Sequence, residues 1–364
     1  MHEERTIAQR VHIDIPLLLG LLLLSSIGLA ALYSAGGQDS GLLVRQGIRL
    51  AVAFTAMFVL AQIPPRHLFF WTPWLYAIGI ALLIAVLAFG EVTQGAQRWI
   101  RIGPLNFQPS EMLKITVPMM VAYYLGDRTL PPTFVRVLGA GLLVAVPTLL
   151  IARQPDLGTA LLIACSGVFV LLLGGISVRL ISACAIVASA SAPVMWYLMH
   201  DYQRQRVLTF LDPEQDPLGT GYHIIQSKIA IGSGGMYGKG WLNGTQSQLD
   251  FLPERSTDFV FAVFSEEFGF SGVLTLIAIY LAVVFRGLYI ASQAQDSFTR
   301  LLAGSLVLTF FVYVFVNIGM VSGLLPVVGL PLPLLSYGGT SLVTVMAAFG
   351  ILMSIHTHRR LISE

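Results

Sequence analysis

The feature that most constrains this chain is a series of apolar runs, each about 20 residues long, that recur along its whole length. A helix needs roughly 20 mainly apolar residues to cross the hydrocarbon core of a bilayer. Only 11% of the residues are charged, whereas a soluble domain carries about 25%. We therefore expect an all-α polytopic membrane protein, with residues 1–364 forming one integral membrane domain. The expected spans, about ten in all, are residues 15–33, 47–63, 70–89, 110–125, 134–151, 157–174, 178–199, 259–285, 301–319 and 340–355.

Ten spans would place both termini on one side of the membrane. With the N-terminus inside, the inner segments carry 10 Lys and Arg residues and the outer segments carry 11, five of them in one long loop. Long loops count little in the positive-inside rule, so we expect both termini in the cytoplasm. The first apolar run has no small-residue cleavage site and is expected to be a retained helix. Cations that remain on the outer side suggest an anion-binding role there.

The long outer loop, at about residues 200–258, is the one extended polar part of the chain. Its AIGSGGMYGKG stretch is not a phosphate-binding P-loop, because Ser233 stands where a glycine is needed and Gly240 follows Lys239. The glycines either make the loop flexible or let backbone amides approach a phosphate. No basic tract indicates nucleic acid. Cys165 and Cys184 lie in apolar runs and are interpreted as packing residues, so no disulfide or metal site is predicted.

Ionisable residues also gather between the third and fifth expected spans. Arg98 and Arg101 flank Trp99, either as an interfacial anchor or as part of a binding site. Glu111 and Lys114 have the i, i+3 spacing that places them on one helix face, where they form a structural or a catalytic pair.

Three further stretches carry the remaining candidates. Asp156, in ARQPDLGTA, either caps the sixth span or pairs with an outer arginine. Asp258, in STDFVF, lies where the loop returns to the membrane. There it is either in the first turn of a helix capped by Ser256 or Thr257, or an interfacial carboxylate beside cations. The segment from Asn317 to Ser341 is apolar but broken by prolines and glycines, which favours a re-entrant or cavity-lining segment.

Four motifs together carry a resemblance to a known family. They are QRWIRIGPLNFQPSEMLKI, ARQPDLGTALL, PLPLLSYGGTSL and the loop sequence from RVLTFLDPEQDPLGTGYH to GTQSQLDFLPERSTDFVFAVFSEEFG. Nearly the whole chain resembles the SEDS family (shape, elongation, division, sporulation), and most of all its elongation branch. The division branch is similar enough to stay open.

The resemblance implies a peptidoglycan glycosyltransferase with ten transmembrane helices in the bacterial cytoplasmic (inner) membrane. Such proteins polymerise lipid II, a disaccharide-pentapeptide on undecaprenyl diphosphate, at the outer membrane face for cell elongation and rod shape. The implied partners are a class B penicillin-binding protein, which is a transpeptidase, and the elongation machinery, together with membrane lipids and the growing glycan. The family's essential loop aspartate corresponds to Asp258.

The implied chemistry is one inverting displacement that forms a β-1,4 bond, with Asp258 as the general base. The leaving diphosphate needs positive charge. The cationic candidates are Arg98, Arg101, Lys114, Arg204 and Arg206, and the other substrate-binding candidates are Glu111, Asp156, Gln226, Ser227 and Lys239. No cofactor is required by this scheme, although a divalent cation, Mg²⁺ or Mn²⁺, would suit the diphosphate.

Two alternatives stay open at this stage. A flippase for lipid-linked peptidoglycan precursors would need polar groups along a path through the bilayer, whereas this sequence concentrates them on one side. A scaffold that only recruits the transpeptidase would tolerate loss of the Asp258 carboxylate.

Overall fold

The chain forms a helical bundle, seen in a computed structural model that describes residues 11–93, 96–102, 105–126, 129–199, 201–212, 220–248 and 254–358. Each of the ten predicted apolar runs corresponds to a helix. These helices are α2 (Ile15–Ala35), α3 (Ser40–Gln62), α4 (Pro65–Phe89), α5 (Pro109–Gly126), α6 (Phe134–Arg153), α7 (Leu157–Leu173), α8 (Val178–Leu198), α12 (Val260–Ser292), α13 (Ser297–Val321) and α14 (Thr340–Thr357).

Among the described residues, 7 helices are long and apolar enough to cross a membrane. The prediction of a multi-pass helical membrane protein is therefore confirmed, while the count of ten spans stays a prediction. The long polar loop also contains helices, namely α9 (Asp201–Leu211), α10 (Thr220–Ser233) and α11 (Thr245–Gln248).

Aspartates begin several of the helices. Asp14, Asp156 and Asp296 cap α2, α7 and α13, and each accepts a hydrogen bond from a backbone amide of the first turn, from Leu17, Thr159 and Thr299. A side-chain oxygen at this position satisfies an amide that has no partner within its own helix. Short polar residues between apolar runs thus set where the helices start.

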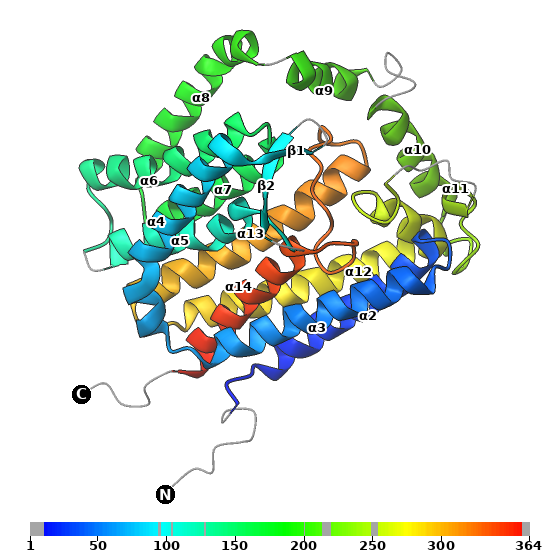
Figure 1. Ribbon diagram of the computed structural model, residues 1–364, viewed down its shortest axis with the longest axis horizontal. Coiled ribbons are helices and arrows are strands. Elements are labelled where there is room, and N and C mark those ends of the chain that lie inside the picture. Colours follow the sequence, from blue (N-terminus) through cyan, green and yellow to red (C-terminus); the bar gives the residue numbers. More distant parts are fainter. Residues whose placement is uncertain are drawn as a thin grey trace, which may run out of the picture.

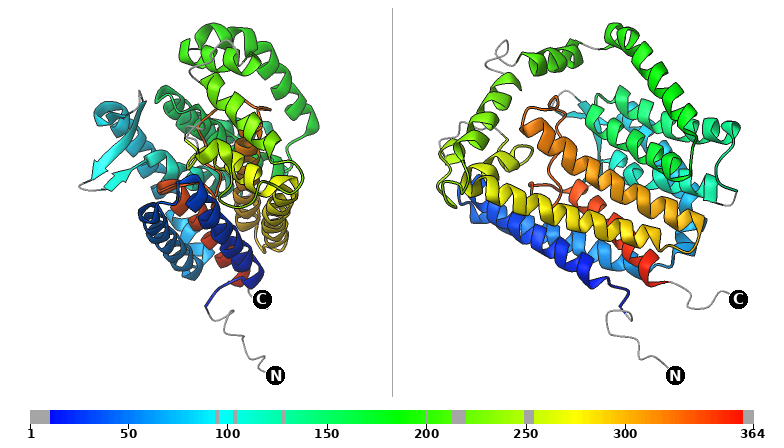
Figure 2. Two further views of the ribbon diagram at one scale, coloured as in Figure 1. Left: turned by 90° about the vertical axis from the view of Figure 1, so that its right-hand side faces the viewer. Right: turned by 180° about the vertical axis from the view of Figure 1, so that it is seen from behind.

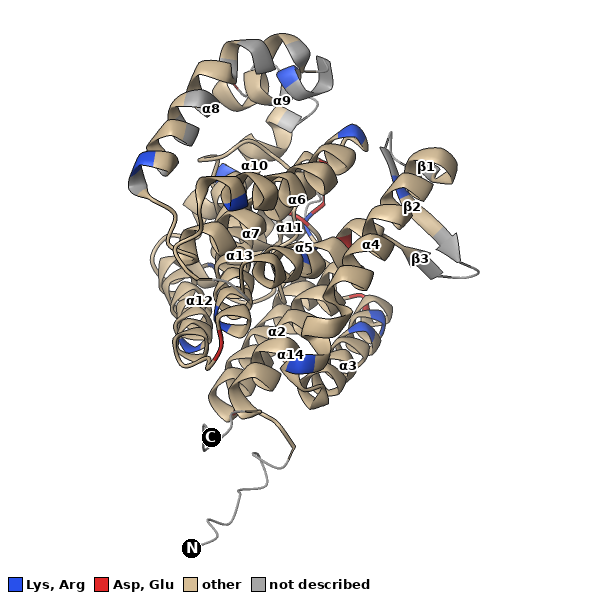
Figure 3. Cartoon of the chain, turned by 90° about the vertical axis from the view of Figure 1, so that its left-hand side faces the viewer, with Lys and Arg blue, Asp and Glu red and all other residues tan. Residues whose placement is uncertain are grey.

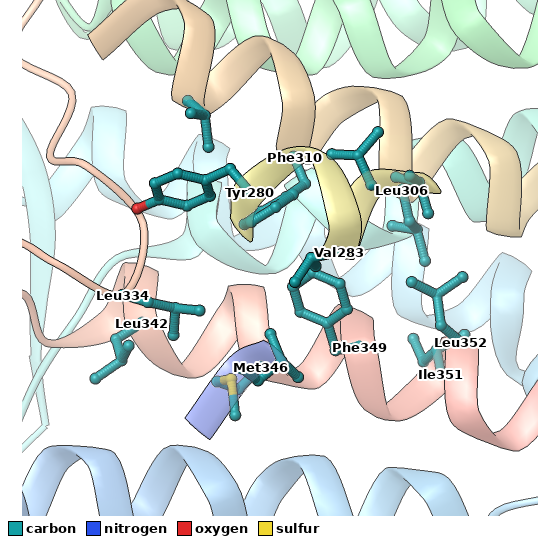
Figure 4. Packing of buried hydrophobic residues seen from close by; sticks show 14 of the residues in the cluster. Tyr280, Val283, Leu306, Phe310, Leu334, Leu342, Met346, Phe349, Ile351 and Leu352 are labelled. Atoms are coloured by element: carbon teal, nitrogen blue, oxygen red, sulfur yellow. The ribbon is translucent and has the colours of Figure 1, made fainter. Parts of the chain in front are cut away.

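The centre of the bundle is built from α12, α13 and α14. Figure 1 shows α12 and α13 running through the molecule, with α2 and α3 on one side and α4 to α7 on the other, and Figure 2 shows the same arrangement from two further directions. α14 packs along α3, and α12 packs against α2 and α13. Figure 4 shows Tyr280, Phe310 and Phe349 from these three central helices meeting in one apolar cluster.

A small antiparallel sheet departs from the all-helical prediction. It has the strand order β1-β2-β3, with β1 (Glu91–Thr93), β2 (Ala96–Ile102) and β3 (Leu105–Phe107). Arg101 pairs with Asn106 across β2 and β3. The sheet projects from the bundle beside α4 (Figure 2), and it fixes the backbone on which Arg98 and Trp99 lie.

Helix α12 is broken at Gly269, which has φ 64° and ψ −166°. A side chain at Gly269 would collide with the backbone of Gly238, so two chain segments approach closely there. Backbone amides of Lys239 and Gly240 donate to the carbonyls of Glu266 and Glu267, at 3.0 Å each. The glycine-rich loop is thus held against the break in α12, while the approach of its backbone amides to a phosphate stays a prediction.

The two ends of the described chain meet at one end of the bundle (Figure 1). The rings of His12 and His358 stack 3.8 Å apart. Arg286 donates to both oxygens of Asp14, at 3.0 and 2.6 Å. Burial acts to raise the pKa of the Asp14 carboxyl, but hydrogen bonds from His356 and Arg286 outweigh it and hold that pKa well below its usual range. The side of the membrane on which the ends lie stays a prediction.

Candidate functional site

Charged residues are scarce in the bundle (Figure 3), yet several of them surround one cavity. Its volume is about 930 Å³, and it is formed by α3, β2, α5, α7, α13, α14 and the connection between α13 and α14. The polar and aromatic lining residues include Arg49, Arg98, Trp99, Gln108, Glu111, Lys114, Asp156, Thr159, Tyr313, Tyr337 and Ser341. An apolar part is lined by Val52, Met112, Ile115, Val343 and Ala347.

Glu111 and Lys114 form an ion pair in the first turns of α5. Lys114 Nζ lies 2.7 Å from Glu111 Oε1, and the two side chains are only 7% and 8% exposed. Lys114 also lies 5.0 Å above the ring of Tyr313. The second carboxylate oxygen, Glu111 Oε2, is buried without a hydrogen-bond partner among the described residues. The pair predicted from the i, i+3 spacing is confirmed, and it faces the cavity.

Arg98 and Asp156 join β2 to the start of α7. Arg98 Nε lies 3.8 Å from Asp156 Oδ2, and Arg98 Nη2 donates to the Pro155 carbonyl at 2.7 Å. Asp156 also accepts hydrogen bonds from the Gln108 amide and from the backbone of Thr159. Asp156 therefore caps α7 and also pairs with an arginine, as the two interpretations from sequence suggested, while the membrane side of Arg98 stays a prediction.

Arg49 is a cavity residue that the sequence reasoning did not select. It projects from α3, and its guanidinium carbon lies 4.1 Å from the centre of the Tyr337 ring. The two other described cations that line the cavity, Arg98 and Lys114, each have a carboxylate partner. Arg49 contacts the face of the Tyr337 ring instead. Within the described part of the chain, no carboxylate neutralises the charge of Arg49.

The connection between α13 and α14 is the broken apolar segment expected from sequence. Residues 322–339 contain no helix or strand, and residues 329–331 and 337–339 line the cavity. Side chains of two neighbouring helices donate hydrogen bonds to backbone carbonyls of the connection. The Tyr280 hydroxyl donates to the Pro333 carbonyl at 2.5 Å, and the Asn317 amide donates to the Leu330 carbonyl at 2.6 Å. The cavity-lining prediction is confirmed, and these bonds show how irregular backbone is accommodated inside the bundle.

Asp258 lies at the edge of this cavity. A Cβ added to the lining residue Gly329 would lie 3.6 Å from Asp258 Oδ2. Tyr313, which also lines the cavity, interacts electrostatically with Lys114, Glu111 and Asp258. Two residues distant in sequence, Asp258 and Lys114, are thus brought to one site.

Of the two interpretations of the STDFVF stretch, the one with Asp258 in the first turn of a helix capped by Ser256 or Thr257 is wrong. α12 begins at Val260 with Phe259 as its N-cap, and no side chain caps it. The Thr257 hydroxyl instead donates to Glu254 Oε2 at 2.7 Å within the preceding turn. Asp258 therefore precedes the helix and does not lie in its first turn.

Comparison with known proteins identifies the family of the chain. Residues 9–361 match the family model FTSW_RODA_SPOVE, described as a cell cycle protein. The chain belongs to this family. It is 56% identical to the peptidoglycan glycosyltransferase MrdB of Escherichia coli (strain K12), over 99% of this chain and 98% of that protein. It is 37% identical to a probable peptidoglycan glycosyltransferase FtsW of Geobacter metallireducens, over 95% of each chain.

Solved structures of the family share the fold. One, from work on the structural coordination of polymerization and crosslinking by a peptidoglycan synthase complex, matches with a TM-score of 0.84 and 33% identity, covering 96% of this chain and 98% of that chain. The rod shape determining protein RodA of Thermus thermophilus matches with a TM-score of 0.72 and 29% identity, covering 94% and 96%.

The remaining candidates in the long loop lie away from the cavity lining. Arg204 donates to the carbonyls of Trp196 and Tyr197 at 2.9 and 2.7 Å, at the end of α8. Lys239 pairs with Glu266 at 2.7 Å. Ser227 is fully buried and donates to the Val321 carbonyl at 2.7 Å, and Gln226 is half-buried on the same helix. The side chains of Arg101 and Arg206 lie outside the described part of the chain.

The described carboxylate, histidine and cysteine side chains do not form a metal site by themselves. Within the described ranges, no three His, Cys, Asp or Glu side chains come together as ligands. Glu111 and Asp156 are already paired with cations. The suggestion of a divalent cation on the diphosphate stays a prediction.

Proposed function

We propose that this chain is an elongation-type peptidoglycan glycosyltransferase that polymerises lipid II, with Asp258 as its general base. The observation that carries the proposal is the position of Asp258 at the edge of a large cavity lined by Arg49, Arg98 and Lys114. A carboxylate and a group of cations are the two elements that this displacement requires. The higher identity to MrdB than to FtsW favours elongation over division.

The reaction balances with one base. The 4-hydroxyl of the acceptor N-acetylglucosamine attacks C1 of the donor N-acetylmuramic acid, and the Asp258 carboxylate takes the hydroxyl proton. The bond between C1 and the diphosphate oxygen breaks, and undecaprenyl diphosphate leaves with the electron pair. The α-linked donor becomes a β-1,4 link, so no covalent enzyme intermediate is needed. General-base help of this kind contributes typically 10²–10⁴-fold.

The cavity cations would stabilise the negative charge that grows on the leaving diphosphate. Arg49 contacts an aromatic ring rather than a carboxylate, so no ion pair has to be broken before it binds a phosphate. Arg98 lies 3.8 Å from Asp156, a loose contact that leaves guanidinium donors for a ligand. The apolar part, with Val52, Ile115 and Val343, suits the isoprenoid chain of the same substrate.

The proposed partner is a class B penicillin-binding protein. This part of the proposal is supported by the structural likeness to a chain from a peptidoglycan synthase complex that coordinates polymerization and crosslinking. A product strand that must be crosslinked calls for a transpeptidase near the point of polymerisation.

The test is polymerisation of purified lipid II by the purified chain with its transpeptidase partner. The wild type should produce glycan strands, whereas Asp258→Ala and Asp258→Asn should lower the rate by at least about 10²-fold while retaining the wild-type melting temperature. Full polymerisation by either variant would overturn the assignment of Asp258 as the base. Movement of labelled lipid II across proteoliposome membranes without any polymer would instead favour a flippase.

A further inference from the structure

We infer that Asn317 is the positioning residue that holds Asp258 at the edge of the cavity. This inference rests on the proposed role of Asp258 as the base. Asn317 lies on α13 and is completely buried. Its side-chain Nδ2 donates to the backbone carbonyl of Asp258 at 3.0 Å and to that of Leu330 at 2.6 Å. One side chain therefore binds both the segment that carries the base and the segment that forms the cavity wall.

The chemistry of the two contacts requires an amide group. A side-chain NH₂ carries two N–H donors, which match the two carbonyl oxygens that converge on it. The other end of the group, Asn317 Oδ1, is buried without a hydrogen-bond partner among the described residues. Aspartate would turn an oxygen toward the two carbonyls, and leucine would offer them no donor, so neither can replace this contact.

The two segments have one further backbone connection. The Tyr337 amide donates to the Ser256 carbonyl at 2.8 Å. Gly329, with φ 71°, directly precedes Leu330, and a Cβ added to it would lie 3.6 Å from Asp258 Oδ2. Asn317 binds at Leu330, the residue after Gly329, and therefore acts on the wall directly beside the carboxylate.

The expected effect concerns turnover rather than substrate affinity. Asn317 is buried behind the wall and does not line the cavity, so it is not expected to touch lipid II. A base displaced by about 1 Å can cost on the order of 10²-fold in rate, because proton transfer needs close contact with the attacking hydroxyl. Loss of Asn317 should therefore lower kcat and leave KM for lipid II nearly unchanged.

The experiment compares Asn317→Asp and Asn317→Leu with the wild type in the full-length complex. Turnover and KM for lipid II are measured, with the rate normalised to the monodisperse, folded fraction. The matched control is Ser305→Ala on the same helix, because Ser305 is also completely buried and donates to a distant carbonyl, that of Ser166, at 2.7 Å. Both Asn317 variants should lose about 10²-fold in kcat, and the control should stay within about threefold of the wild type.

The outcomes separate the two proposals. Wild-type kcat in a folded Asn317 variant, an increase confined to KM, or an equal loss in Ser305→Ala would each overturn the positioning role. Should Asn317→Leu fail to fold, Asn317→Asp, which keeps the size of the side chain, decides the question. If Asp258→Asn polymerises normally, the base assignment fails, whatever the Asn317 variants do. If it is inactive while Asn317→Asp is fully active, only this inference fails.

Discussion

Cations in the cavity and cations in the long loop looked equivalent in the sequence but have different surroundings. Lys114 and Arg98 line one large cavity, and each has a carboxylate partner that also lines it. Arg204 instead binds the end of α8, and Lys239 pairs with Glu266 in α12. The loop cations therefore hold the fold of the loop together, whereas the cavity cations are placed to meet a ligand.

The largest difference between the cavity cations and the loop cations is expected when the buried ion pair of Glu111 and Lys114 is removed. Lys114→Met leaves Glu111 as an uncompensated buried charge, which should lower the free energy of unfolding by about 3–5 kcal/mol and stop polymerisation. The double variant Glu111→Gln/Lys114→Met removes both charges and should recover most of the stability but not the activity. Thermal unfolding and lipid II polymerisation measure the two effects. A double variant that polymerises at the wild-type rate would show that the pair is structural only.

A smaller effect, on activity alone, is expected for Arg49→Gln. It removes one positive charge from the cavity, and the polymerisation rate should fall by about ten- to a hundredfold, because a hydrogen bond to a charged group contributes about 1.5–3 kcal/mol. The melting temperature should change little, since a partly exposed cation–π contact contributes only about 0.5–1 kcal/mol. Arg45→Gln is the matched control, because Arg45 lies on the same helix and pairs with Asp39 outside the cavity lining. Equal rates for the two variants would contradict a role for Arg49.

The smallest effect on activity is expected for Lys239→Met. This change removes the cationic partner of Glu266, whose side chain is completely buried. It should lower the melting temperature of the protein. The polymerisation rate of the folded fraction should stay within about twofold of the wild type, because hydrogen bonds from Thr245 and Gln246 still hold Glu266. Lys228→Met, an exposed change on α10, serves as the control. A large loss of polymerisation rate without a loss of stability would show that Lys239 takes part in substrate binding.

Local patterns predicted much of the fold. Apolar runs located the helices, and the spacing of Glu111 and Lys114 predicted their ion pair. The prolines and glycines after α13 predicted the broken segment. Each of these features depends on residues close together in the chain, so that short-range geometry was sufficient.

Features that depend on distant segments could not be predicted in the same way. Arg49 looked like one more outer cation, because only the fold brings α3 beside the residues 337–339 of the connection. Asn317 had no signal of its own, since its two partners are backbone carbonyls elsewhere in the chain. The strand β2 was not predicted, because AQRWIRI does not alternate strictly between polar and apolar residues: Trp99 and Ile100 are adjacent.

The break at Gly269 also bears on how deep the Asp258 carboxylate lies in the bilayer. The 23 residues from Phe270 to Ser292 extend about 34 Å as a helix, which already matches the roughly 30 Å of hydrocarbon in a bilayer. We therefore expect the nine residues from Val260 to Phe268 to lie at the level of the lipid headgroups, with Asp258 two residues before them. Lipids with longer acyl chains would shift the headgroup plane, and with it the diphosphate of the substrate, relative to that carboxylate. If Asp258 is the base, we therefore expect the polymerisation rate to depend on membrane thickness.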